Sequence, residues 1–158
     1  MKRTVTAFAF LLMTASLAAA AGFEIQAKEK TVGKHEGADQ DLPRGASRAV
    51  REEKVIEFEI RNLVPRNGVT YRVEWIVLTE RSDGRIAFGT QGEKEITPRF
   101  GERIEWKTDP VILTGREWEG RRGGTVEDKI AGYGIRIVDP DGAVQAEKYN
   151  PSSLQDEI

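Results

Sequence analysis

The chain has 158 residues, no cysteine, and 24 basic against 26 acidic side chains, for a formal net charge of −2. This length fits one domain, and the mildly acidic balance argues against general nucleic-acid binding, which requires a basic face. Without cysteine there are neither disulfides nor zinc-type cysteine clusters, so stability must come from a hydrophobic core.

The N-terminus has the pattern of a secretory signal peptide over residues 1–21. Lys2 and Arg3 precede an apolar run at 7–21, which is too short and alanine-rich to span a bilayer, since a span takes roughly 20 strongly apolar residues. The run ends in small residues, as a cleavage site requires. We therefore expect export to the periplasm, the cell surface or the medium, and no membrane span in the mature chain of residues 22–158.

The junction between Gly22 and Phe23 also matches the cleavage point of a type IV pilin precursor. A pilin keeps its apolar helix after that cut, whereas here the apolar residues precede the cut and the polar sequence EIQAKEK follows it. Such a segment cannot bury itself in a filament core or a membrane. The chain is therefore not predicted to be a pilin subunit.

Apolar and polar side chains alternate with a period of two along most of the mature chain. In residues 55–61, for example, Ile56, Phe58 and Ile60 share one face. This period is typical of half-buried strands in antiparallel sheets. We expect strands near 23–30, 53–62, 69–80, 85–91, 102–107, 111–114, 129–138 and 142–149.

Turn signals separate these strands. Asp-Gly pairs at 83–84 and 141–142 favour tight hairpins because glycine tolerates positive φ, and residues 65–68 form another break. Seven or eight short strands with such turns predict an all-β protein, a single immunoglobulin-like antiparallel β-sandwich that spans residues 22–158.

Two longer polar stretches interrupt the alternation. Residues 31–51 and 114–128 are predicted as loops, and loops of this length are usually functional or disordered. A short helical turn is predicted within 44–54.

Two aromatic residues give the sandwich a family resemblance. Trp75 in the third strand and Tyr133 in the penultimate strand resemble the core tryptophan and the tyrosine corner of immunoglobulin and fibronectin type III domains. In those domains a disulfide usually joins the two sheets, and its positions would fall near Ile60 and Ile135 here. Both residues are aliphatic, as in cysteine-free members of the superfold. The layout is also similar to small exported immunoglobulin-like proteins that accompany type IV pilus-like systems in gut bacteria. This resemblance implies a fold and an envelope setting, not an activity.

Signatures of catalysis are missing. The single histidine, His35, has no cysteine or second histidine to complete a dyad or a zinc site. No serine lies in a nucleophile elbow, and GRRGG at 120–124 lacks the ending of a phosphate loop. Asp139 and Asp141 could hold calcium, but a plain turn explains them better. We expect no catalytic residue, no cofactor and no metal.

The best binding candidate is the stretch GREWEGRRGG at 115–124. Trp118 has no place in the alternation, and tryptophan and arginine in end loops are frequent recognition anchors. We expect Trp118 to stack on a sugar or to enter a partner's pocket, unless it folds back over the core edge. The arginines expected to pair with acidic groups beside it are Arg116, Arg121 and Arg122.

The first strand is a candidate for exchange between copies. It carries Phe23, Ile25 and Ala27 on one face and is tethered by the polar stretch 31–51. Because lengthening a loop costs little entropy, this strand is free to pair with its own domain or with a neighbour's. Exchange of an edge strand would give a strand-swapped homo-oligomer.

These observations favour a non-catalytic exported domain for protein binding or assembly at the cell envelope, beside a pilus-like or secretion apparatus. One alternative is a carbohydrate-binding module that uses Trp118 and Tyr149. Another is a hydrolase with an unrecognised pair of carboxylates. A periplasmic chaperone is disfavoured, since those usually carry two sandwiches.

Overall fold

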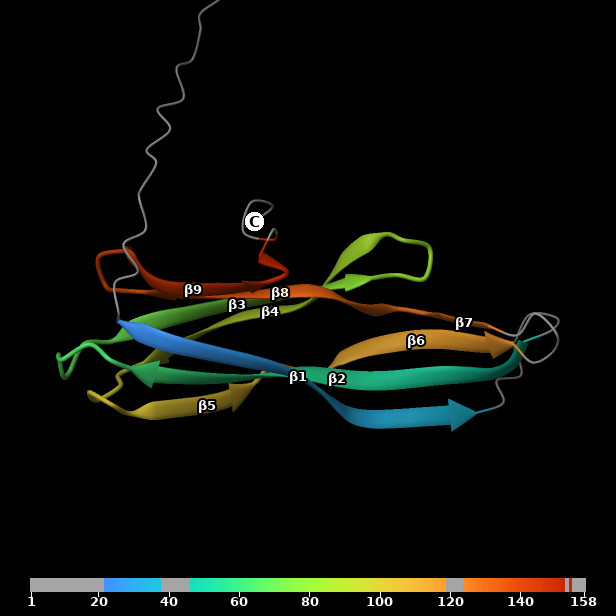
Figure 1. Cartoon of the computed structure of the whole chain (residues 1–158), viewed down its shortest axis with the longest axis horizontal. Coiled ribbons are helices and arrows are strands. Elements are labelled where there is room, and N and C mark those ends of the chain that lie inside the picture. Colours follow the sequence, from blue (N-terminus) through green and yellow to red (C-terminus); the bar gives the residue numbers. More distant parts are fainter. Residues whose placement is uncertain (1–21, 38–45, 119–123, 153, 155–158) are drawn as a thin grey trace, which may run out of the picture.

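The computed structural model describes residues 22–37, 46–118, 124–152 and 154 (Figure 1). Within these ranges the backbone forms nine strands and no α-helix. The strands are β1 (Phe23–Gly37), β2 (Ala46–Asn62), β3 (Tyr71–Glu80), β4 (Ile86–Ile96), β5 (Arg103–Lys107), β6 (Val111–Trp118), β7 (Gly124–Glu127), β8 (Lys129–Val138) and β9 (Val144–Asn150). The predicted all-β fold is confirmed, with nine strands rather than seven or eight.

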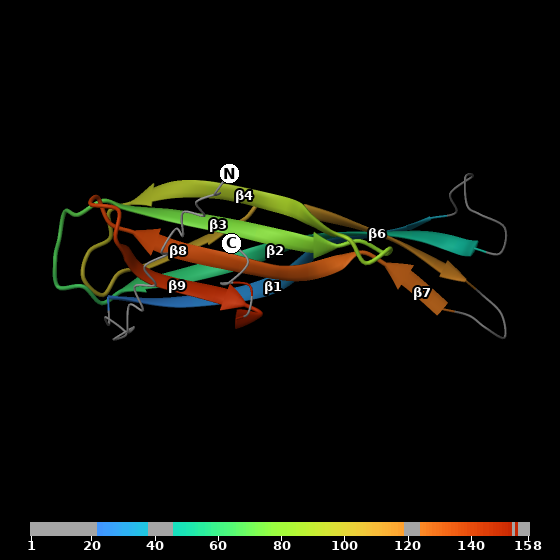
Figure 2. The ribbon, with the colours of Figure 1, turned by 90° about the horizontal axis from the view of Figure 1, so that it is seen from above.

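The strands form two antiparallel sheets that face each other. The first sheet has the order β1-β2-β6-β7, with β5 also paired to β2, and the second has the order β4-β3-β8-β9. The long strand β2 pairs with β1 along one edge, while its other edge is shared by β6 and β5. Figures 1 and 2 show the first sheet continuing past the end of the second. We call this part the distal extension: residues 31–37, 46–54 and 114–118 of β1, β2 and β6, together with β7. Val111 and Leu113, at the start of β6, still belong to the core.

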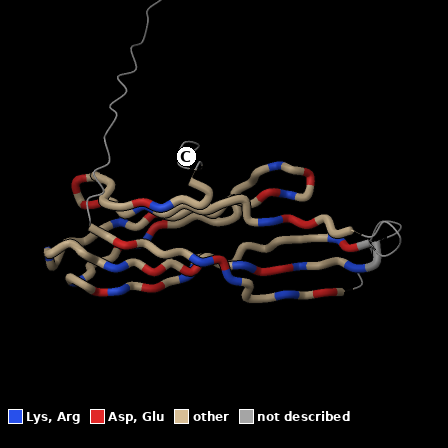
Figure 3. The backbone as a smooth tube through the Cα atoms, viewed as in Figure 1, with Lys and Arg blue, Asp and Glu red and all other residues tan. Residues whose placement is uncertain are grey.

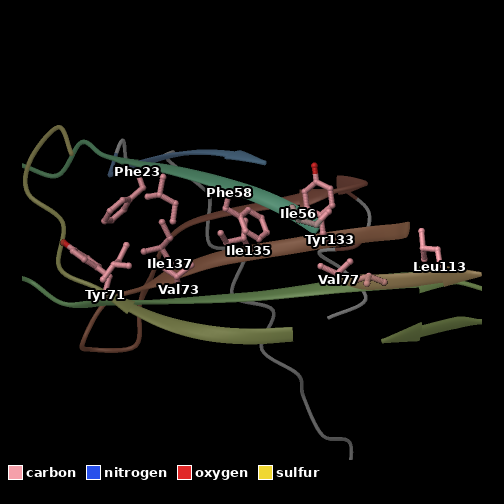
Figure 4. Close-up of a cluster of buried hydrophobic side chains, with 13 residues drawn as sticks. Phe23, Ile56, Phe58, Tyr71, Val73, Val77, Leu113, Tyr133, Ile135 and Ile137 are labelled. Carbon is pink, nitrogen blue, oxygen red and sulfur yellow. The ribbon is translucent and has the colours of Figure 1, made fainter. Parts of the chain in front are cut away.

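The core lies where the two sheets overlap, and Figure 4 shows its side chains converging from both. Phe58 and Ile135 come from opposite sheets and are each 1% exposed. The predicted core role of Trp75 and Tyr133 is confirmed, since Tyr133 is buried and Trp75 packs against the cluster. The Tyr133 hydroxyl donates to the Ala27 carbonyl at 3.5 Å. This bond reaches across the sandwich to β1, which differs from a tyrosine corner.

The loop predicted at 31–51 is wrong for the described part of that stretch. β1 continues to Gly37 and β2 begins at Ala46, so the helical turn predicted within 44–54 is also wrong where it is described. Both faces of the distal extension meet water, so its strands need no apolar side. They are held by main-chain pairing and by ion pairs such as those of Arg48 with Glu36 and Glu117. Figure 3 shows the basic and acidic residues interspersed along these strands. In the same way, the predicted loop 114–128 contains the end of β6 and all of β7.

Strand β1 pairs with β2 of its own chain from Phe23 opposite Asn62 to Gly37 opposite Ala49. The exchange face of Phe23, Ile25 and Ala27 therefore lies in an intramolecular hairpin here. The long tether that motivated exchange is reduced to residues 38–45, which lie outside the described residues. Exchange stays a prediction.

Asp128, just after β7, joins the distal extension to the β3–β4 hairpin. Its carboxylate accepts hydrogen bonds from the Ser82 N–H at 2.9 Å and the Arg81 guanidinium at 3.2 Å. It also accepts from the Thr114 hydroxyl at 2.9 Å and the Thr114 N–H at 3.3 Å. One buried carboxylate thereby links three separate segments of the chain.

No helix in the described ranges has the length and apolarity needed to cross a membrane. The signal peptide predicted at 1–21 lies outside the described residues.

Candidate functional site

The outer face of the second sheet carries a groove of about 440 Å³. Its central row crosses all four strands: Ile76 on β3 lies opposite Gln91 on β4 and Gly134 on β8, and Gly134 lies opposite Tyr149 on β9. Ile76 and Gly134 form the floor, because β3 and β8 are the central strands of the sheet. Gln91 and Tyr149 stand on the two edge strands as opposite sides of the groove.

The ring of Tyr149 lies over Gly134. A methyl group at Gly134 would stand only 2.5 Å from Cδ1 of that ring, so the ring can take this position only because residue 134 has no side chain. Burial raises the pKa of the Tyr149 hydroxyl, and the nearby Glu147 carboxylate raises it further. The groove therefore presents a neutral aromatic ring beside its floor at physiological pH.

A row of charged side chains runs next to the central row of the groove. The Glu74 carboxylate accepts a hydrogen bond from Arg136 Nε and, at 2.7 Å, forms an ion pair with Arg72. The hydrogen bond to Glu74 raises the pKa of Arg136, which keeps the guanidinium charged and fixed beside the groove. The row thus supplies an oriented donor group.

Two polar side chains on β4 have no partner among the described residues. Neither the Gln91 amide nor the Glu93 carboxylate makes a hydrogen bond or an ion pair within that part of the chain. Many other carboxylates on the sheet faces are paired, for instance Glu57 with Lys30 and Lys107. Gln91 and Glu93 therefore remain available to a ligand in the groove.

The groove lining does not show the arrangement of carboxylates that the hydrolase alternative requires. Its lining carboxylates, Glu74 and Glu93, are opposite each other on neighbouring strands, so they lie side by side rather than across a cleft. A hydrolase of the predicted kind needs two acids that flank the bond to be cut. In addition, Glu74 is already held by two arginines.

Other candidate residues lie apart from the groove. The described residues contain no group of three or more His, Asp or Glu that could hold a metal ion. Asp139 accepts from the N–H groups of Asp141 and Ala143 and from the Gln145 amide, which is the hydrogen-bonding pattern of a turn. His35 lies exposed on β1.

The predicted Trp118 site is only partly described. Arg116 is exposed on β6, in the distal extension, and lies opposite Ala49 and Val126. Trp118 is the last residue of β6, and its side chain lies outside the description. Arg121 and Arg122 also lie outside the described residues. The groove is on the other sheet, so the structure does not bring Arg116 to it.

Sequence reasoning named Tyr149 but missed the rest of the groove. The signal that points to it is an isolated glycine within a strand pattern, since such a glycine often marks a close approach of other groups. Gly134 meets the Tyr149 ring on the outer face. Gly92 meets the Trp75 ring, where a methyl group would stand 2.5 Å from Cζ2.

No protein-family model and no curated protein matches the chain. Among solved structures, it is similar to a candidate ApaA protein from Bordetella pertussis, with 9% identity, a TM-score of 0.38, and coverage of 81% of this chain and 93% of that one. It is also similar to a Northeast Structural Genomics Consortium target, SoR45, with 10% identity, a TM-score of 0.38, and coverage of 82% and 85%. Likenesses this distant carry no argument about function.

Proposed function

We propose that the chain is a non-catalytic, exported binding domain that holds a neutral saccharide in the groove of the second sheet. The observation that carries this proposal is the Tyr149 ring fixed over Gly134, across from the unpartnered Gln91 and Glu93. Export rests on the predicted signal peptide at 1–21.

A saccharide fits this combination of groups. A sugar ring has an apolar C–H face that packs on an aromatic ring, and hydroxyls that both donate and accept hydrogen bonds. Tyr149 offers the ring, Glu93 accepts, Arg136 donates, and the Gln91 amide does both. The Glu93 carboxylate, which has no cationic partner among the described residues, favours a neutral sugar over an anionic one.

A peptide fits the groove less well. The floor belongs to β3 and β8, whose main-chain groups are already paired on both sides, so an extended peptide cannot add there as a strand. Protein binding or assembly at the envelope remains a second candidate function, and the observation that favours it is the outer edge of β1 over residues 31–37, to which no described residue bonds. Association with a pilus-like or secretion apparatus stays a prediction.

The test is a glycan array probed with residues 22–158, followed by calorimetry with the best ligand. Tyr149→Ala should weaken binding at least about tenfold, because losing the stacked ring removes on the order of 1.4 kcal/mol or more. Phe100→Ala is the matched control, since Phe100 is 59% exposed and lies outside the groove lining. An array without binders, or equal affinities for wild type and Tyr149→Ala, would remove the proposal.

The shape of the groove gives a second prediction. Gly134→Ala should also impair saccharide binding, because the new methyl group would displace the Tyr149 ring that lies 2.5 Å away. Near-ultraviolet circular dichroism should report the altered tyrosine environment, and calorimetry the loss of affinity. Gly37→Ala makes the same substitution where nothing lies within 4 Å and should bind as wild type does. Unchanged binding by Gly134→Ala would show that the ring position does not matter.

A further inference from the structure

The outer edge of β1 is blocked by side chains in its first half only. β1 is the end strand of the first sheet. In its first half, the Ile25 carbonyl accepts from Lys148 Nζ at 3.2 Å and the Ala27 carbonyl accepts from the Tyr133 hydroxyl at 3.5 Å. Side chains of the second sheet thus occupy the main-chain groups with which another strand would have to pair.

The second half of β1, residues 31–37, has no such cover. It belongs to the distal extension, beyond the second sheet (Figures 1 and 2). No donor or acceptor among the described residues reaches its outer edge. Exposed, unpaired edges are templates for pairing with another chain, and soluble proteins normally block them.

The register shows which main-chain groups this edge presents. The N–H and C=O of Ile56 bond to Thr108, on the side of β2 away from β1. Every second residue of β2 turns its groups the same way. Lys34 and Glu36 lie opposite residues of that set, so their own N–H and C=O groups point outward, to the free edge.

The sequence of this edge is complementary to itself. An antiparallel pairing of two copies about His35 sets the outward groups of Lys34 against those of Glu36 in the second copy, as a hydrogen-bonded pair. It also places the Lys34 side chain of each copy directly opposite the Glu36 side chain of the other. Opposite charges at such positions stabilise cross-strand pairs. Gly33 meets Gly37 in the same register, so no side chain obstructs the approach.

We propose that two copies of this chain associate through residues 33–37 of β1, paired antiparallel about a two-fold axis at His35. Each β1 stays in its own sheet, so this differs from exchange of the first strand. Two other edges, those of β7 and β4, are less suitable. β7 has only four residues, and pairing of β4 about Lys94 would bring Glu93 against Glu95 of the second copy. The proposal is independent of the saccharide groove.

The test measures the mass of residues 22–158 by sedimentation equilibrium from roughly 10 µM to 1 mM, the range of weak association. We expect a reversible dimer. Glu36→Pro removes an outward N–H but no main-chain bond to β2. It also removes the ion pairs of Glu36 with Lys34 and Arg48, but exposed ion pairs add little to stability. The variant should therefore be monomeric throughout and keep its thermal midpoint. His35→Pro is the matched control, because that N–H points to β2 and its loss should lower the midpoint.

A charge-swap series tests the register without proline. Lys34→Glu should weaken the dimer at least about tenfold because it sets like charges opposite each other, and adding Glu36→Lys should restore it. A wild type that is monomeric throughout would overturn the proposal. So would a dimer that survives Glu36→Pro, because that result would locate the interface elsewhere, including in exchange of residues 23–27. Failure of the double variant to recover would rule out the register about His35.

Discussion

Phe58→Ala should lower the free energy of unfolding by about 3–5 kcal/mol, the cost of replacing a buried phenylalanine by alanine. Phe58 is 1% exposed, and its ring centroid lies 5.4 Å from that of Trp106 and 6.3 Å from that of Tyr133. These neighbours come from both sheets, so the cavity would open at the centre of the sandwich. A domain of ordinary stability has only about 5–15 kcal/mol in total, so the loss would be large.

Denaturant unfolding followed by tryptophan fluorescence measures this loss. Phe88→Ala is the matched control, since Phe88 is 73% exposed on β4, and an exposed site should change stability by no more than about 0.5 kcal/mol. If both substitutions cost the same, the core would not be where the structure places it.

The sandwich itself could be predicted because its strands have one apolar face. In β3 and β8, alternating residues such as Val73 and Ile137 are completely buried, and the period of two expresses that burial directly. The β8 boundaries were predicted as they stand, Lys129–Val138. Where a strand has one buried face and one exposed face, the sequence predicts the strand reliably.

The distal extension could not be predicted in this way. Residues 31–37 of β1 have no buried side chain, and those of β7 are all exposed. With water on both faces, apolar residues have no reason to alternate. Their strand conformation comes from pairing with neighbouring strands, and the local sequence does not reveal which strands pair. Residues 31–37 and β7 therefore have the sequence pattern of polar loops.

The groove escaped prediction for a related reason. Ile76, Gln91, Gly134 and Tyr149 are far apart in sequence and form a row only through the registers of three strand pairs. Two of those registers contain irregularities next to the row, between Val77 and Leu78 and between Leu78 and Thr79. A shift of one residue moves a side chain to the other face, so alternation alone cannot assemble such a row.

The two proposals would reinforce each other. The groove lies on the outer face of the second sheet, and residues 33–37 lie in the part of the first sheet beyond it (Figure 1). Pairing of β1 edges would therefore leave both grooves of a dimer open. On a surface with repeated sugars, two linked sites can raise the apparent affinity by about 10²–10⁴ without a new contact. Glu36→Pro should then reduce binding to immobilised glycan while leaving single-site affinity unchanged.

Asp128→Ala should lower the free energy of unfolding by about 2–4 kcal/mol, because it removes a charged acceptor and leaves partly buried donors unsatisfied. Asp128 is 6% exposed and accepts from Ser82, Thr114 and Arg81. Burial by itself would raise the pKa of this carboxyl, but the hydrogen bonds outweigh it and lower the pKa below 3.8.

The sign of that shift fixes the pH dependence. A carboxyl whose pKa is lower in the folded state stabilises the fold above about pH 4, near its unfolded value, and this stabilisation is lost as the pH falls through the folded value. Denaturant unfolding from pH 7 to pH 2 should therefore show a shallower acid decline for Asp128→Ala than for wild type. Asp109→Ala, at an exposed site, should follow wild type. Parallel declines for Asp128→Ala and wild type would mean that the joint between the hairpin and the distal extension does not depend on this charge.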